Sequence, residues 1–203
     1  RRIASFRELP DDGTVGVLVD PECGCLDELR PDLLVDAIMA KRNCGTRRDM
    51  ARRVIGLGPG FCAPQDVHAV VETLRGHNLG RVILEGKAAP DTGVPGEIGG
   101  VTTERLVRSP GDGFLKPLSE IGGLVEAGQV LGTVDGKPVL AKIGGVLRGL
   151  IHSTVPVQEG MKIGDVDPRA VRSHCFSISD KALSVGGGVL EAAFAVRLGS
   201  GDP

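Results

Sequence analysis

The chain of 203 residues contains no Trp or Tyr and carries a formal net charge of −2, so its core must be aliphatic and no nucleic acid partner is expected. Its five cysteines are irregularly spaced, unlike a secreted disulfide framework, which predicts reduced thiols in the cytoplasm. No apolar stretch approaches the roughly 20 residues that cross a bilayer, so no membrane association is expected.

The segment before Pro90 predicts strands and helices in alternation, as in a parallel sheet. The clearest helix signals lie at residues 31–40, where Pro31 stands in the first turn and Lys41-Arg42 follow the last. Strands are expected over residues 14–20, 53–58 and 79–85, and a second helix over residues 65–74. The glycine- and proline-rich stretch 90–100 predicts a boundary.

Residues 107–166 contain an internal repeat with a constant offset of 32 residues. Val107, Gly113, Leu115, Leu118, Val125, Gly128, Gly132, Val134 and Asp135 recur as Val139, Gly145, Leu147, Leu150, Val157, Gly160, Gly164, Val166 and Asp167. Each half predicts short strands between glycine turns, and such a half cannot bury its apolar face alone. Two halves paired about a pseudo-twofold axis predict a barrel-sandwich hybrid of the biotinyl/lipoyl type.

The last segment predicts a strand at 174–180 and a helix at 189–196 that returns to the first α/β segment. The expected fold class is therefore α/β, with a Rossmann-like parallel-sheet body and an inserted β-rich barrel-sandwich hybrid module. The expected division is 1–100 for the α/β part, 101–168 for the module of two half-repeats and 169–203 for the C-terminal segment. Because the chain opens on Arg1 rather than Met, it stays open whether the α/β part lacks its N-terminal portion.

Two thiols, Cys23 and Cys25, flank a glycine at the end of the first expected strand. A thiol in such a position is activated if a positive charge or a helix N-terminus lowers its pKa. The C-x-C spacing differs from the C-x-x-C redox motif, so two inert loop thiols fit the same residues.

A second group of polar residues lies on the expected helix at 65–74. His68 and Glu72 are four residues apart, which places them on one helix face, and His77 follows in the next turn. The spacing suits metal ligands or an acid/base pair, and the residues are assigned here to catalysis without a metal. A capped helix followed by a hydrogen-bonded turn is the alternative.

Two glycine clusters predict anion sites because small residues let backbone N–H groups approach a phosphate. Gly56, Gly58 and Gly60 follow an expected strand. Gly186, Gly187 and Gly188 precede an expected helix. A tight strand-to-helix turn and close helix packing are the respective alternatives.

Several long blocks of the sequence, among them Ile55-Gly-Leu-Gly-Pro-Gly-Phe61, are similar to the YqeB-type accessory (maturation) proteins of selenium-dependent molybdenum hydroxylases. The blocks cover residues 19–23, 34–43, 55–61, 66–73, 75–81, 93–100, 160–169 and 186–192. The resemblance implies a role in maturing a molybdenum hydroxylase whose cofactor carries labile selenium. It also implies partnership with that hydroxylase and with other selenium and molybdenum-cofactor maturation proteins.

From this resemblance follows a working hypothesis about the site. Cys23 would handle the chalcogen, His68, Glu72 and His77 would orient the substrate, and the glycine turn at 56–60 would hold a phosphate. The cofactor is not identified, and a molybdopterin-type cofactor or selenium are the candidates. One alternative is a non-catalytic scaffold that docks the hydroxylase or another maturation factor through the barrel-sandwich module, and another is a carrier modified at Lys137. Whether the chain catalyses any step stays open.

Overall fold

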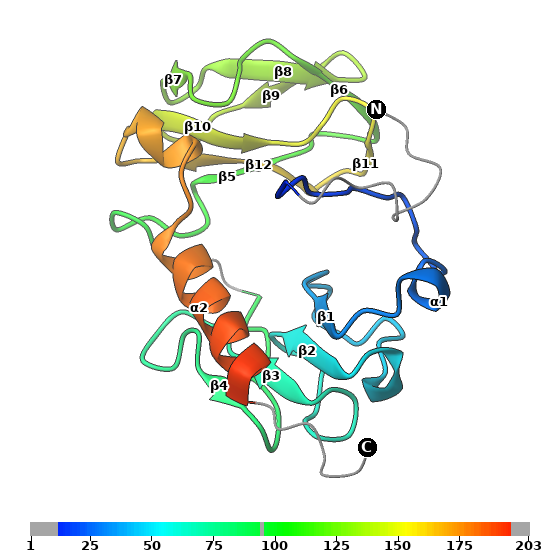
Figure 1. The fold of residues 1–203 in the computed structure, drawn as a ribbon. Helices are drawn as coiled ribbons and strands as arrows, with labels where there is room; N and C mark the ends of the chain where they lie inside the picture. The colour runs from blue at the N-terminus through cyan, green and yellow to red at the C-terminus, as the bar shows by residue number, and fades with distance from the viewer. Residues whose placement is uncertain (1–11, 94–95, 196–203) are drawn as a thin grey trace, which may run out of the picture. The chain divides into compact units, whose positions relative to one another are not determined.

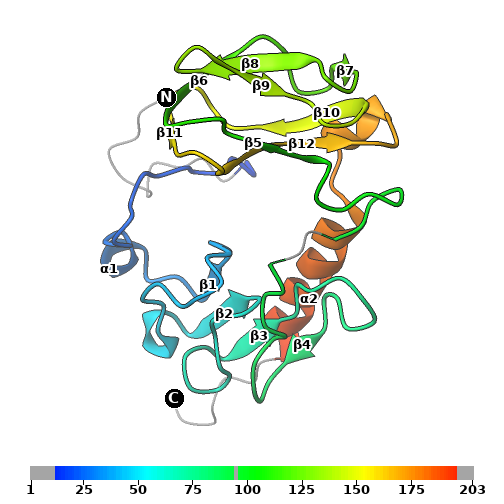
Figure 2. The same cartoon turned by 180° about the vertical axis from the view of Figure 1, so that it is seen from behind.

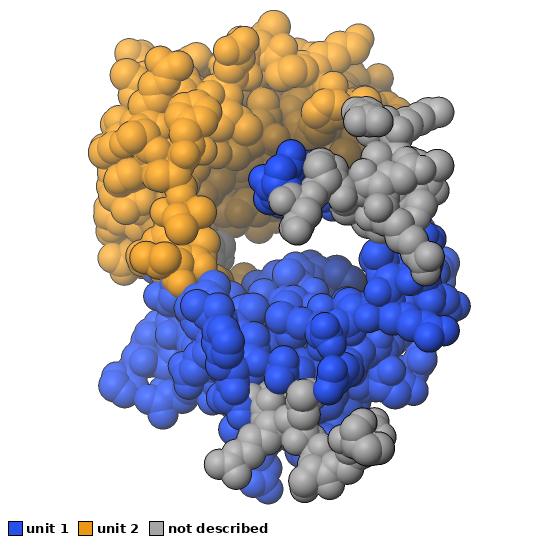
Figure 3. Space-filling model, in the orientation of Figure 1, with its two compact units in different colours: residues 1–90, 184–203 blue, residues 91–183 orange. Residues whose placement is uncertain are grey.

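The computed structural model describes residues 12–93 and 96–195 of the chain. Within these ranges the regular structure is mostly β, with three four-stranded sheets and two α-helices. The chain divides into two compact units, unit 1 made of residues 1–90 and 184–203 and unit 2 of residues 91–183 (Figure 3). None of the helices in the described ranges is long and apolar enough to cross a membrane.

The sheet of unit 1 has four short strands in the order β1-β2-β3-β4 (Figure 1). They are β1 Leu33–Asp36, β2 Arg53–Leu57, β3 Ala69–Val71 and β4 Val82–Ile83. Strands β1, β2 and β3 run parallel, whereas β4 pairs with β3 in the antiparallel direction. Every residue of β3 is buried, which is typical of a strand whose sheet is covered on both faces.

Helix α2, Asp180–Ala195, covers one face of this sheet from Ser184 onward (Figures 1 and 2). Its Ala192 is fully buried against side chains from β2 and β3, namely Ile55, Leu57, Ala69 and Val71. The other face of the sheet holds a second cluster, formed by Val54, Phe61, Ala63, Val67, Val70 and Ala88. The remaining short elements of unit 1 are helix α1 Leu26–Leu29 and the 3-10 turn η2 Arg48–Met50.

The expected Rossmann-like parallel-sheet body is wrong. The sheet of unit 1 is mixed, its strands are short, and α2 is the only helix longer than one turn in the described ranges. The helix expected at 31–40 is instead β1 and a loop, because Leu33 to Asp36 pair in register with Arg53 to Gly56. The helix expected at 65–74 is β3, where a continuous apolar run suits a buried strand.

The other expected elements of the flanking segments have mixed outcomes. The strand expected at 53–58 is confirmed as β2, and the one at 79–85 is reduced to β4. Residues 14–20 form no strand and Val17 is 91% exposed, because a β-branched segment needs a partner edge that it does not meet here. The strand expected at 174–180 is replaced by the 3-10 turn η3 Arg172–Cys175. Helix α2 begins nine residues before the expected 189, at Asp180.

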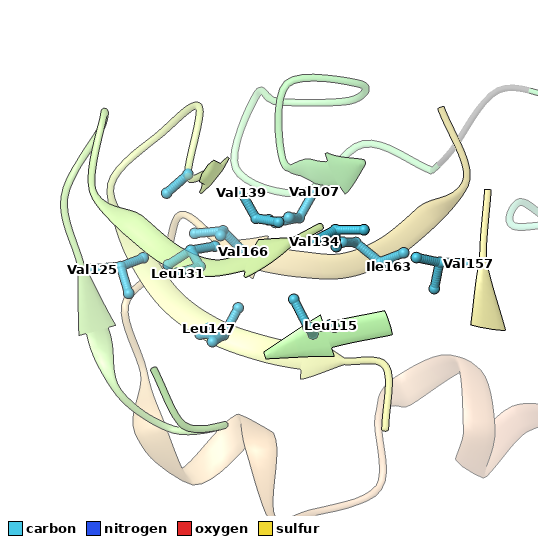
Figure 4. Close-up of a cluster of buried hydrophobic side chains, with 11 residues drawn as sticks. Val107, Leu115, Val125, Leu131, Val134, Val139, Leu147, Val157, Ile163 and Val166 are labelled. Carbon is cyan, nitrogen blue, oxygen red and sulfur yellow. The ribbon is translucent and has the colours of Figure 1, made fainter. Parts of the chain in front are cut away.

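Unit 2 contains eight strands in two four-stranded antiparallel sheets, with the orders β5-β12-β10-β7 and β11-β6-β8-β9. The strands are β5 Leu106–Arg108, β6 Gly113–Pro117, β7 Leu124–Val125, β8 Val130–Val134, β9 Lys137–Leu140, β10 Gly145–Leu150, β11 Pro156–Val157 and β12 Lys162–Asp167. One buried aliphatic cluster lies between the two sheets (Figure 4).

The sequence repeat organises both the strands and this cluster. A forward shift of 32 residues places β5 on β9 and β7 on β11, and a backward shift of 32 residues places β12 on β8 and β10 on β6. The strand order of one sheet is therefore repeated in the other. The buried residues pair in the same way: Val107 with Val139, Leu115 with Leu147, Val125 with Val157, Leu131 with Ile163, and Val134 with Val166 (Figure 4). Each fully buried side chain of this size stabilises the fold by about 1.5–3 kcal/mol.

Unit 2 is longer than the sequence repeat, since it runs from residue 91 to residue 183 and the repeat covers residues 107–166. It therefore includes the segment that leads into β5 and the segment with η3 that follows β12. The division at residues 100 and 168 that the sequence suggests stays a prediction.

Candidate functional site

The turn from Asp20 to Cys25 presents one thiol to solvent. The carbonyl oxygen of Asp20 accepts the N–H of Cys23 at 3.2 Å, and its carboxylate oxygen Oδ2 accepts the N–H of Cys25 at 2.7 Å. These bonds hold Cys23 in the left-handed region at φ 55, a conformation that is uncommon outside glycine. The Cys23 side chain is exposed. Asp20 therefore organises a turn whose outward group is the Cys23 thiol.

The second thiol of this turn is in a different electrostatic environment. Hydrogen bonds from Cys25, chiefly from its backbone N–H, lower the pKa of Asp20. The same carboxylate accepts a hydrogen bond from the Cys25 thiol, and this contact, followed by desolvation, raises the pKa of Cys25. Because the thiolate is the nucleophilic form, Cys25 is disfavoured as the reactive group.

Glu72 does not share a helix face with His68, because this segment is a strand and a loop. Glu72 is 5% exposed, and its carboxylate accepts three backbone N–H groups. Oε1 receives those of Thr73 and Leu74, and Oε2 receives that of Ala89, each at 2.8 Å. The side chain thus ties the end of β3 to a segment 17 residues further along the chain.

His68 is fixed by strand β2. Its Nδ1 accepts the N–H of Val54 at 3.0 Å, which places the proton of the neutral ring on Nε2. Burial, followed by the positive charge of Arg48, lowers the pKa of His68, so the ring is neutral at pH 7. His77 lies in the turn before β4. In the part of the chain that the structure describes, no hydrogen bond or ion pair joins Cys23, His68, Glu72 and His77.

The glycines at 56, 58 and 60 lie against the protein itself. A Cβ at Gly56 would stand 2.5 Å from the Phe61 ring, and one at Gly58 would stand 2.5 Å from Thr73 Oγ1. At Gly60 it would stand 2.6 Å from the main chain of Arg42. Close packing within unit 1 therefore explains why these three positions are glycine.

Gly186, Gly187 and Gly188 lie inside α2 and not before its first turn, which corrects the expected position of the second anion site. A Cβ at Gly188 would overlap the carbonyl oxygen of Gly80, so this glycine lets the helix approach the loop before β4. Positions 186 and 187 have no such contact. Across residues 12–93 and 96–195, no three His, Cys, Asp or Glu side chains come together as ligands of a metal ion.

Sequence reasoning missed the loop between β1 and β2, because it assigned part of this segment to a helix. The side chain of Asn43 accepts the N–H groups of Gly45 and Thr46 and donates to the Thr46 carbonyl oxygen, each at 2.8 Å. Thr46 Oγ1 in turn donates to Asp36, a buried carboxylate at the end of β1, at 2.5 Å. The Asn-x-Gly-Thr sequence is the local signal of this turn.

A hollow of about 730 Å³ lies beside this loop. It is lined by six residues between Asn43 and Asp49, and by Gln65 and Asp66 on the other side. Unit 1 therefore has two candidate sites, the Asp20–Cys25 turn and this hollow.

Comparisons with known proteins identify a relative that matches most of the chain. No family model matches the chain. The chain is 49% identical to the "Uncharacterized protein YqeB" of Escherichia coli K12 over 189 residues, which is 93% of the chain. The chain spans only 35% of the length of that relative. An aspartoacylase family protein from Mesorhizobium loti is 21% identical over 32% of this chain and 23% of its own, with a TM-score of 0.28, which supports no conclusion.

Proposed function

Because this chain belongs to the YqeB-type family, we propose that it is an accessory protein in the maturation of selenium-dependent molybdenum hydroxylases. In this role it handles selenium or the molybdopterin cofactor that receives it, in the cytoplasm. The observation that carries the proposal is the exposed Cys23 thiol, which the Asp20 turn holds outward. None of the five cysteines is in a disulfide, which is typical of a reducing compartment.

The chemistry of such a thiol is a balanced exchange. The Cys23 thiolate attacks the terminal selenium of a selenopersulfide on a donor protein, and a new S–Se bond forms at Cys23. The S–Se bond of the donor breaks, and its sulfur leaves as a thiolate. No external oxidant or reductant is needed, since a thiolate enters and a thiolate leaves.

Replacement of Cys23 with serine is the direct test. In a strain without its own copy of the gene, the Cys23→Ser protein is expected to lower selenium-dependent hydroxylase activity at least about tenfold, since serine is a far weaker nucleophile. The matched variant Cys25→Ser is expected to retain activity, because the neighbouring carboxylate disfavours that thiolate. Full activity with Cys23→Ser, in a protein that is expressed and folded, contradicts the proposal.

A second function, a scaffold that docks the client through unit 2, is supported by a difference between the two half-repeats. Val146 on β10 lies outside the buried cluster and is fully buried, whereas its counterpart Phe114 on β6 is 53% exposed. Leu150 is partly buried, whereas its counterpart Leu118 is exposed. The reason is the chain path: β12 leads to η3, which packs against β10, while β8 turns directly into β9.

The exposed apolar side chains of Phe114 and Leu118 are therefore the docking candidates. Changing both to serine is expected to reduce recovery of a co-expressed hydroxylase at least about tenfold in a pull-down, as for residues central to an interface. The control is Ile178→Ser, since Ile178 is 73% exposed and Leu118 is 72% exposed. Equal recovery by the double variant and the control excludes docking through this surface.

A further inference from the structure

The turn from Asp20 to Cys25 holds two thiols that are separated by a single residue, Gly24. The carbonyl oxygen of Cys23 accepts the N–H of Leu26 at 3.2 Å, so residues 23–26 form a β-turn. Cys25 is the third residue of this turn, and its backbone angles of φ −63 and ψ −18 suit a type I turn. The chain between the two thiols is therefore folded and not extended. Their Cα atoms lie within the separation of about 7 Å that a disulfide can bridge.

The two thiols differ in exposure but interact with each other. Cys23 is exposed, so an oxidant in solution reaches its sulfur first. Cys25 is half-buried, and its thiol donates a hydrogen bond to the Asp20 carboxylate. This bond, followed by desolvation and by the charges of Asp20 and Cys23, raises the pKa of Cys25. The two sulfur atoms thus lie near enough for the charge of one to act on the other.

Packing does not require a glycine between the two thiols. Gly24 is outside the left-handed region, and a Cβ there would meet only Asp20 Oδ1 at 3.8 Å, an ordinary van der Waals contact. Gly24 instead gives the backbone the freedom to close the small ring that a Cys23–Cys25 disulfide would form. Because strained or exposed disulfides are readily reduced, a disulfide in this exposed turn would be reversible and not structural.

We propose that Cys23 and Cys25 form a reversible disulfide when hydrogen peroxide oxidises the exposed thiol. The Cys23 thiolate attacks one oxygen of the peroxide, the O–O bond breaks, and hydroxide leaves. The sulfur loses two electrons to the peroxide and becomes a sulfenic acid. The Cys25 sulfur then attacks the Cys23 sulfur, an S–S bond forms, and the S–O bond breaks. The oxygen leaves as water and takes up the proton of the Cys25 thiol.

The disulfide protects the exposed thiol and switches it off. While the S–S bond is present, Cys23 is not a nucleophile, and its sulfur does not proceed to the irreversible sulfinic acid. A dithiol reductant restores both thiols by exchange and supplies the two electrons that the peroxide removed. The proposal goes beyond the selenium-handling role of Cys23 and does not rest on it.

The test is peptide mass spectrometry of the full chain after treatment with hydrogen peroxide and alkylation of the remaining thiols. The peptide that contains Cys23 and Cys25 is expected to lose two hydrogen atoms and to escape alkylation. Dithiothreitol is expected to make both thiols available for alkylation again. In Cys25→Ser the Cys23 sulfur has no neighbouring thiol, so sulfinic acid is expected there. The fraction of Cys23 that dithiothreitol recovers is expected to fall at least about tenfold.

The control variant is Cys62→Ser, which removes another half-buried thiol of unit 1, one whose Sγ lies 3.9 Å from the carbonyl oxygen of Ala63. It is expected to form the Cys23–Cys25 disulfide like the unchanged chain. A disulfide from Cys23 to Cys44 or to another chain, or equal recovery of Cys23 in Cys25→Ser, overturns the proposal. Sulfinic acid at Cys23 in the unchanged chain overturns it as well. None of these readouts involves selenium, so they are independent of the test of the selenium role.

Discussion

Replacing Asp167 with asparagine is expected to lower the free energy of unfolding by about 3 kcal/mol, because it breaks a buried ion pair. The Asp167 side chain is fully buried at the end of β12. Its carboxylate accepts Arg169 Nη2 at 2.6 Å and Nε at 2.9 Å, and Arg148 Nη1 at 3.1 Å. An asparagine would leave both arginines without the charge that compensates them. Urea unfolding at pH 7 measures the loss.

The repeat supplies a matched control for this change. Asp135 is the counterpart of Asp167, but it is exposed in the turn between β8 and β9 at φ 48, a conformation that asparagine adopts readily. Asp135→Asn is therefore expected to change the free energy of unfolding by less than about 0.5 kcal/mol. Equal effects of the two substitutions would show that the Asp167 network does not stabilise unit 2.

The same network predicts a pH dependence. Hydrogen bonds from Arg169, followed by smaller effects that include the charge of Arg148, lower the pKa of Asp167 from 3.8 to about 2. The folded state thus binds this proton less tightly than the unfolded state, so the stabilisation is present above about pH 4 and is lost as the pH falls towards 2. The difference corresponds to about 2 kcal/mol. Asp167→Asn is expected to lack this part of the acid sensitivity.

Replacing Glu72 with alanine is expected to cost about 3 kcal/mol of stability, because three backbone N–H groups lose their acceptor in a buried place. The groups are those of Thr73, Leu74 and Ala89. Denaturant unfolding gives the free energy, and hydrogen exchange at Ala89 reports the loss locally. The control is Glu85→Ala, a change at an exposed glutamate near β4.

The Glu72 experiment also separates a structural role from the catalytic role suggested by the sequence. A group used only in chemistry would leave stability unchanged in Glu72→Ala and lower the activity of the client hydroxylase. The three backbone bonds instead predict that the first effect of Glu72→Ala is a loss of stability. Unchanged stability and unchanged hydrogen exchange at Ala89 contradict the structural assignment.

The equivalence of positions in the two halves of unit 2 could be read from the sequence, because the repeat carries long-range information. Two positions that recur at a constant offset, such as Leu115 and Leu147, have equivalent places in their half-units, and both are buried in the shared cluster. The segment 31–40 carries no such information. Its helix-end signals are local. The strand β1 is instead determined by pairing with β2, in which Leu33 lies opposite Arg53, about 20 residues further along the chain.

The candidate site was predictable only in part. The sequence indicated an exposed loop thiol at Cys23, and the structure shows that thiol exposed. It did not indicate that the Asp20 carboxylate would contact Cys25, since backbone geometry decides which of two neighbouring thiols it meets. The hollow beside the β1–β2 loop was not predictable, because its lining residues at 43–49 and 65–66 come together only in the folded chain.

The most direct test of the central proposal is the selenium content of the protein, purified without oxygen from cells that make selenium-dependent hydroxylases. About one selenium per chain is predicted, released by excess small-molecule thiol as expected for an S–Se bond, and absent from Cys23→Ser. Cys25→Ser is predicted to keep its selenium. No selenium in the unchanged protein, or equal selenium in Cys23→Ser, would contradict the role of Cys23 as the chalcogen-handling thiol.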